Sequence, residues 1–231
     1  MGWTVGVLTL AALAAVGWPA WVTAAGPATE AIRSTINQVI RLLEDQELKK
    51  PGRSEERRRR LEKVIGDRFS YEEMAKRSLG AQWRQLNDAE RKEFVELFQK
   101  LLSHSYLGKI EGYSGEQVRY LNERLGEGYA EVRTKVVSSK TEIPLDYRLL
   151  NTGGDWRVYD VVVDGVSLVN NYRGQFARIL RSSSYADLVE QLRKKSAQIS
   201  APKVPPKGIE GPDIRSNTQV SPQGVAGPDV R

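Results

Sequence analysis

Two carboxylates in the second half of the chain have a spacing that could support acid–base chemistry. Asp160 lies within the apolar run that begins at Trp156, and Asp164 directly follows that run. A general acid and a general base need two such groups in different surroundings. The same residue types also serve as a buried hydrogen-bond acceptor and as a turn residue. We favour these structural roles and keep the acid–base pair as the alternative.

Few other groups offer chemistry. The chain has no cysteine and a single histidine, His104, which excludes disulfides and thiolate catalysis and leaves little for a metal site. It has no glycine-rich phosphate loop opening a helix and no nucleophile–base motif. We interpret His104 as a hydrogen-bonded structural residue. The sequence therefore predicts a protein that is not an enzyme and that needs no metal or cofactor.

The charge of the chain favours acidic partners. Its formal net charge is +6, and Arg57 to Arg60 form a basic run. That run could dock on anionic lipid headgroups or an acidic protein. It could also be a solvated helix face, supported by pairs from Glu55 to Arg59 and from Glu56 to Arg60. Nucleic acid is not an expected partner, because the run is isolated and lacks interleaved aromatic side chains.

The elements that would position these residues follow from hydrophobic periodicity. The helical period predicts helices over 28–48, from 54 onward, and over 70–79, 87–107, 167–180 and 185–195. Asn87 and Glu90 resemble a capping box, and Ser167 is a further candidate cap. Alternating residues predict strands over 117–125, 129–138, 142–151 and 156–163. Short turns between them indicate an α+β fold with a four-stranded antiparallel meander sheet, one face of which packs on the helices.

The two ends of the chain differ from this central region. Residues 1–25 carry no charge, and the apolar stretch from Val5 to Val16 followed by small residues predicts a secretory signal peptide. An uncleaved membrane anchor is the alternative. Residues 197–231 are rich in proline and glycine and are expected to be disordered. There the segment 208–215 nearly repeats as 224–231, either as a duplicated peptide ligand or by low-complexity drift. The domain itself is expected to span 26–196.

The run from Trp156 to Phe176 also carries a resemblance. Its pattern is W-x-V-Y-D-x-x-x-x-G-V-S-L-V-x-N-Y-R-x-x-F, and it follows M-A-K-R-S-L-G at 74–80 and F-x-x-x-F-x-x-L-L at 94–102. In this order and spacing the segments resemble the MlaC (toluene-tolerance) family of periplasmic phospholipid-binding proteins, over roughly 28–196.

The resemblance implies a lipid carrier. Acyl tails would lie in a cone-like apolar cavity between sheet and helices, with the headgroup exposed and no ATP or metal on the protein. The protein would be the soluble periplasmic component of an ABC-type lipid transport system that maintains outer-membrane lipid asymmetry. Its expected partners are phospholipid, an inner-membrane ABC lipid transporter complex and an outer-membrane lipoprotein–porin complex. Site residues carried over from the family pattern are Tyr106, Tyr159 and Val166.

Strand alternation adds Val132, Leu145 and Tyr147 to the expected lipid-binding residues, with dry core packing as the alternative for all six. A sixteen-carbon chain that leaves water gains about 13 kcal/mol, from about 0.8 kcal/mol per methylene. A bilayer gives the same gain, so a carrier can exchange lipid with a membrane at little net free energy. The alternatives are a hopanoid-associated member of the family, a structural envelope adaptor with a filled interior, and an isomerase that uses Asp160.

Overall fold

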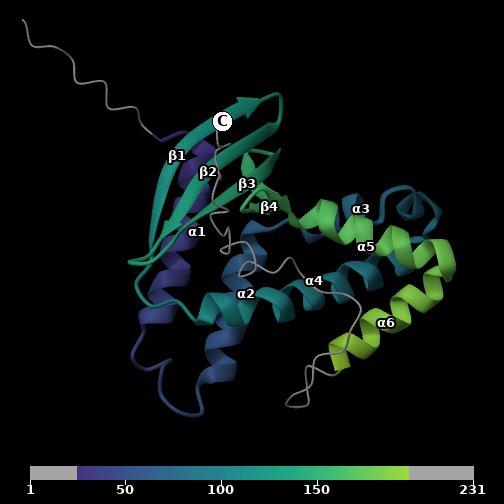
Figure 1. Cartoon of the computed structure of the whole chain (residues 1–231), viewed down its shortest axis with the longest axis horizontal. Coiled ribbons are helices and arrows are strands. Elements are labelled where there is room, and N and C mark those ends of the chain that lie inside the picture. The colour runs from purple at the N-terminus through teal and green to yellow at the C-terminus, as the bar shows by residue number, and fades with distance from the viewer. Residues whose placement is uncertain (1–24, 198–231) are drawn as a thin grey trace, which may run out of the picture.

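The computed structural model describes residues 25–197. The predicted signal peptide or anchor and nearly all of the predicted tail lie outside the described residues. Figure 1 shows an α+β arrangement in which a sheet is flanked by the first two helices, while the later helices extend away to one side. No helix within residues 25–197 is both long enough and apolar enough to span a bilayer.

Six α-helices and one 3-10 helix are present in the described chain. They are α1 (Pro27–Glu44), α2 (Ser54–Arg68), α3 (Tyr71–Leu79), the 3-10 helix η1 (Gly80–Gln85), α4 (Asp88–Glu111), α5 (Leu168–Ser182) and α6 (Tyr185–Ala197). The capping box at Asn87 and Glu90 is confirmed, since each side chain accepts from the other's backbone N–H. Ser167 caps α5 by accepting from the N–H of Asn170 at 3.1 Å.

The first helix ends earlier than its apolar period predicts. It stops at Glu44 instead of continuing to Leu48. The Asp45 carboxylate accepts from the N–H groups of Glu47 at 2.8 Å and Leu48 at 3.2 Å. An aspartate that binds the backbone just ahead of it favours a turn over a helix.

The sheet is an antiparallel meander in the order β1-β2-β3-β4-β5. Its strands are β1 (Gln117–Gly126), β2 (Tyr129–Val137), β3 (Glu142–Thr152), β4 (Asp155–Val163) and β5 (Val166–Ser167). The fifth strand corrects the expected count of four. Asp164 and Gly165 have φ angles of 48° and 80°. Positive φ at both central residues suits a tight hairpin turn, so the chain reverses and Val166 pairs with Val163.

Strand register gathers apolar side chains on one face of the sheet. Val132 pairs with Tyr147, and Thr134 pairs with Leu145, which in turn pairs with Val163. The period of two places these residues on the same face, which we call the inner face. Charged residues alternate with them and point to the other face, which includes Glu131, Arg133, Lys135 and Arg148.

Two main clusters of buried side chains hold the fold together. One lies among α3, α4, α5 and α6, where Phe94, Phe98, Tyr172 and Phe176 meet, largely edge to face. The other lies between the inner face of the sheet and the start of α1. A small third cluster of Leu43, Leu61 and Leu107 joins α1, α2 and α4.

The arginine run at the start of α2 is paired within the protein. Arg60 lies 2.6 Å from Glu56 and Arg59 lies 3.7 Å from Glu55, as the helical spacing predicts. Arg57 and Arg58 both reach Glu111 of α4, at 3.2 and 2.7 Å. These contacts fit the interpretation as a solvated helix face, and they link α2 to the end of α4.

Candidate functional site

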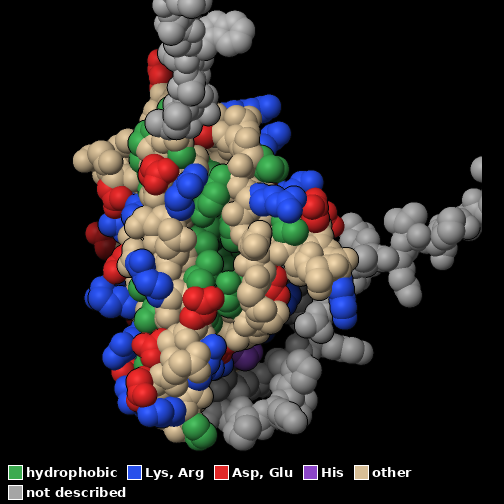
Figure 2. All heavy atoms as spheres, turned by 90° about the vertical axis from the view of Figure 1, so that its left-hand side faces the viewer, with side chains coloured by type: hydrophobic (Ala, Val, Ile, Leu, Met, Phe, Trp, Pro, Cys, Tyr) green, Lys and Arg blue, Asp and Glu red, His purple; other side chains and the backbone are tan. Residues whose placement is uncertain are grey.

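An apolar cavity of about 490 Å³ lies between the inner face of the sheet and helices α1, α2 and α4. Its wall includes Ile36, Val39 and Ile40 of α1, Leu102 of α4, Ile143 of β3 and Val161 of β4. Figure 2 looks at the side where α1 and β1 lie and shows hydrophobic side chains along a vertical hollow, with charged side chains on either side. The cavity is therefore open to solvent on one side.

The path of α1 explains why space remains here. At its start, Ala28 and Ile32 pack on the sheet; Ala28 is completely buried and Ile32 almost completely buried. There Glu123 of β1 accepts from the N–H of Thr29 at 2.7 Å and from its hydroxyl at 2.5 Å, which ties the helix start to the edge strand. At its end, Leu43 packs on α2 and α4 instead. The helix therefore diverges from the sheet, and the gap between them is the cavity.

The burial of the wall residues defines an inner end and a mouth. Residues such as Val161, Val163 and Leu168 are buried, whereas the exposed members of the wall are Lys109, Gly112 and Thr141. These three lie at the end of α4 and in the β2–β3 turn. The mouth is therefore at that end of the fold.

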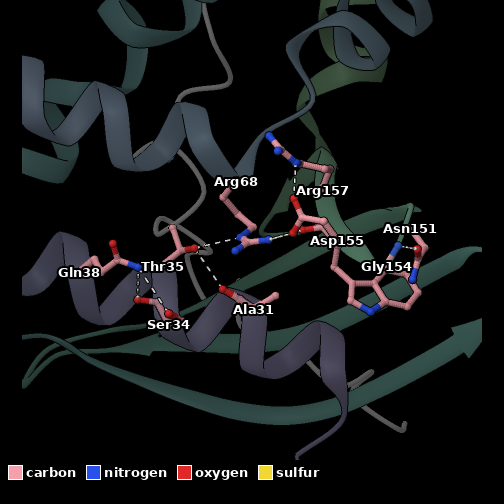
Figure 3. A network of polar contacts seen from close by, with 10 residues as sticks. Ala31, Ser34, Thr35, Gln38, Arg68, Asn151, Gly154, Asp155 and Arg157 are labelled. Carbon is pink, nitrogen blue, oxygen red and sulfur yellow. Dashed lines mark hydrogen bonds and ion pairs between the residues drawn. The ribbon is translucent and has the colours of Figure 1, made fainter.

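Arg68 at the end of α2 fixes the two helices to the sheet. Its guanidinium donates to the Thr35 hydroxyl at 3.1 Å, to Asp155 at 2.7 Å and to the carbonyl of Trp156 at 2.7 Å. Figure 3 shows it between Thr35 of α1 and Asp155 of β4. Arg157 also donates to Asp155, at 2.6 Å. The charge of Arg68 is therefore paired within the protein by Asp155.

Hydrogen bonding also sets the charge of Asp155. Burial would raise the pKa of this carboxyl, but hydrogen bonds from Arg68 and Arg157 outweigh it and lower the pKa below its usual value near 3.8. Asp155 is therefore ionised at neutral pH and pairs with Arg68. This ion pair joins the end of α2 to the start of β4 beside the cavity.

Three of the tyrosines in the wall, Tyr71, Tyr106 and Tyr147, stay neutral. Burial, with a smaller contribution from the charge of Glu62, raises the pKa of Tyr71 to about 12. Burial likewise raises the pKa of Tyr106 and of Tyr147. None of the three introduces charge at neutral pH, so the interior suits an uncharged apolar group.

Three of the six site residues expected from the sequence line this cavity. They are Tyr106, Leu145 and Tyr147. Val132 is fully buried in the cluster beneath the start of α1. Tyr159 and Val166 lie elsewhere. The structure thus brings half of the expected set together around the cavity.

Tyr159 and Val166 are absent from the cavity wall. The ring of Tyr159 lies 4.2 Å below the guanidinium carbon of Arg77 and contacts Tyr129 edge to face. A register shift in the β3–β4 pairing leaves Tyr159 without a partner residue on β3, and such a bulge re-aims the side chain. Val166 is 43% exposed in the two-residue strand β5.

Several wall residues were not identified from the sequence. The apolar stripe of α1 was recognised as one face of an amphipathic helix, but its period does not distinguish a cavity wall from a filled core. Arg68 and Lys109 were also missed, because an isolated cation carries no sequence signal of its own. Only their position in the fold shows that they line the cavity.

The two candidate catalytic carboxylates have structural surroundings. Asp160 is only 2% exposed and accepts from the Ser167 hydroxyl at 2.6 Å, the N–H of Val169 at 3.1 Å and Arg148 at 3.1 Å. It thus anchors the start of α5 to β4. Asp164 occupies the positive-φ turn before β5. Neither lines the cavity, and residues 25–197 contain no cluster of His, Asp and Glu suited to a metal ion.

Comparison with known proteins identifies the family. The sequence model of the MlaC protein family matches residues 33–194, which is more than half of the chain. The chain belongs to the MlaC family. The resemblance drawn from the spaced motifs is therefore confirmed.

Two characterised relatives and one solved structure extend the comparison. The chain is 23% identical over 126 residues to the intermembrane phospholipid transport system binding protein MlaC of Haemophilus influenzae, covering 52% of this chain and 59% of that protein. It is 25% identical over 120 residues to the toluene tolerance protein ttg2D of Pseudomonas putida, covering 51% and 56%. These matches span less than two thirds of either relative.

The solved structure is the phospholipid-binding protein of Ralstonia solanacearum in complex with a phospholipid. It superposes with a TM-score of 0.68 at 23% identity, covering 75% of this chain and 98% of that one. At this identity the likeness establishes a shared fold, and the α+β architecture expected from the sequence is confirmed.

Proposed function

We propose that this chain binds phospholipid, with the acyl chains in the cavity and the headgroup at the mouth. The observation that carries the proposal is the apolar cavity of about 490 Å³. Ligand pockets typically enclose about 300–1,000 Å³ and combine apolar walls with a few polar groups. Here most of the wall is apolar, and the exposed cation Lys109 lies at the mouth. That arrangement matches an amphipathic ligand with an apolar tail and a charged head.

The energetics suit a carrier. Each methylene buried gains about 0.8 kcal/mol relative to water, but a bilayer offers the same gain. The protein must therefore match the bilayer rather than water, and lipid can pass between them without a large change in free energy. A charged headgroup left at the mouth avoids the large penalty for burying an unpaired charge. An envelope adaptor with a filled interior would not have this cavity.

The wider role is part of the proposal. The chain would act in the periplasm as the lipid-binding component of an ABC-type transport system, moving phospholipid between an outer-membrane lipoprotein–porin complex and an inner-membrane transporter. Residues 26–196 would form the lipid-binding domain, preceded by a signal peptide or anchor. Membership of the MlaC family supports this role. The arrangement of Asp160 and Asp164 favours a binding protein over an enzyme.

Native mass spectrometry of protein purified from the exported fraction, followed by lipid extraction, tests the proposal. We expect a one-to-one adduct with the mass of a glycerophospholipid. An adduct of hopanoid mass would identify a hopanoid, and not a phospholipid, as the ligand. Repeated recovery of stable, lipid-free protein after exposure to phospholipid vesicles would refute lipid binding.

A further inference from the structure

Among residues 25–197, four charged residues line the cavity: Glu62, Arg68, Lys109 and Glu116. Three of them are engaged by the protein itself. Glu62 accepts a hydrogen bond from the Ser103 hydroxyl, and Arg68 is held by the contacts described above. Glu116 accepts from the N–H of Ser114 at 2.7 Å and from its hydroxyl at 2.9 Å. Lys109 differs from all three.

The ammonium of Lys109 forms no ion pair or hydrogen bond with any of residues 25–197; its one recorded contact is the face of the Tyr106 ring, 5.6 Å from the centroid. Lys109 lies in the last turn of α4, where the negative end of the helix dipole favours a cation. Its side chain is exposed, so the charge remains hydrated while it borders the cavity. An anion can therefore reach this cation without first breaking a salt bridge.

The position of Lys109 determines which anion it would meet. It is one of the three exposed wall residues that mark the mouth. A lipid whose chains extend toward the buried end of the cavity places its polar group here. Lysine is a well-suited point-charge partner for phosphate, and charge-assisted hydrogen bonds of this kind are among the stronger ones.

We propose that Lys109 binds the phosphate of the lipid headgroup at the mouth and so selects phospholipids over uncharged lipids with the same acyl chains. This inference rests on the proposed function, because it requires acyl chains in the cavity. Tyr106 is a positioning residue, because the Lys109 ammonium lies against the face of its ring. The cavity alone would bind any lipid of suitable tail size, whereas Lys109 adds a preference at the headgroup.

The test compares two lipids that differ only in the headgroup. Delipidated full-length protein is equilibrated with vesicles that contain phosphatidylethanolamine and diacylglycerol with identical acyl chains in equimolar amounts. Native mass spectrometry then gives the ratio of the two bound lipids. We expect Lys109→Gln to lower the ratio of phospholipid to diacylglycerol by about twofold to fivefold, the range for a solvent-exposed ion pair.

Lys100→Gln is the matched control, because Lys100 is an exposed lysine on the same helix that does not line the cavity. Its ratio should equal that of the wild type. An unchanged ratio in Lys109→Gln, with lipid still bound, would overturn the assignment of Lys109 and leave the proposed function standing. Absence of both lipids from the wild-type protein would instead refute the proposed function itself.

Discussion

Filling the cavity from the α1 side should abolish lipid retention without damaging the fold. Ile40 suits this purpose, because it lines the cavity yet belongs to none of the core clusters. Replacing Ile40 by tryptophan adds about six heavy atoms to the space that acyl chains would occupy. Displacing about six methylenes at about 0.8 kcal/mol each removes about 5 kcal/mol of lipid binding relative to the bilayer. Since about 1.4 kcal/mol corresponds to a factor of ten, retention should fall by roughly a few thousandfold.

The assay is the lipid-to-protein ratio after purification and after incubation with phospholipid vesicles. Asn37→Trp is the control, since Asn37 is an exposed residue of the same helix and does not line the cavity. Thermal unfolding of both variants should stay close to that of the wild type, because the added ring enters existing space and overpacking is limited. A folded Ile40→Trp protein that retains a full complement of phospholipid would refute the placement of the acyl chains.

Four further predictions concern the wall, the turn and the mouth. Arg68→Met should lower the free energy of unfolding, measured in urea, by about 1.5–3 kcal/mol, the scale for hydrogen bonds to a charged group. If Arg68→Met lowers this free energy no more than Arg157→Met does, the central role of Arg68 is contradicted. The pKa of Asp155 is lowered in the folded protein, so ionised Asp155 stabilises the fold above its usual pKa near 3.8. That stabilisation is lost as the pH falls through the folded-state pKa. Asp155→Asn should therefore weaken the decline of folding stability below about pH 4. Val166→Glu should keep a wild-type lipid content, because Val166 is exposed and does not line the cavity. A folded variant without lipid would support Val166 as a site residue. Hydrogen bonds from Ser114 lower the pKa of Glu116 and keep its carboxylate ionised near the mouth. Glu116→Gln should therefore raise the amount of bound phosphatidylglycerol relative to phosphatidylethanolamine. An unchanged ratio of the two lipids in native mass spectrometry would count against an electrostatic effect of Glu116.

The local elements of the fold could be predicted because their signals are local. Asn87 with Glu90 and Ser167 occupy cap positions through contacts within three residues. The alternation in β2 and β3 placed Val132, Leu145 and Tyr147 on one face, and their pairing agrees. The short strand β5 was missed, because a two-residue strand has too few residues to show a period.

The cavity could not be predicted from the same patterns. Val132 and Leu145 share a face, but Val132 is fully buried in the cluster beneath the start of α1, whereas Leu145 is half-buried and lines the cavity. The path of α1 determines whether an inward-facing residue packs against the helix or lines the cavity. That path is set by long-range contacts, from Thr29 to Glu123 and from Thr35 to Arg68. Neither contact has a signature in the local sequence.

Mapping the acyl chain directly tests the central claim. A phospholipid with a photoreactive group near the end of one acyl chain would be loaded into the full-length protein and cross-linked, and the modified residues would be found by peptide mass spectrometry. We predict adducts on the cavity wall, at Ile36, Ile40, Ile143 and Leu145 in particular. Adducts confined to the opposite face of the sheet or to the exposed turn at Val166 would contradict lipid binding in this cavity.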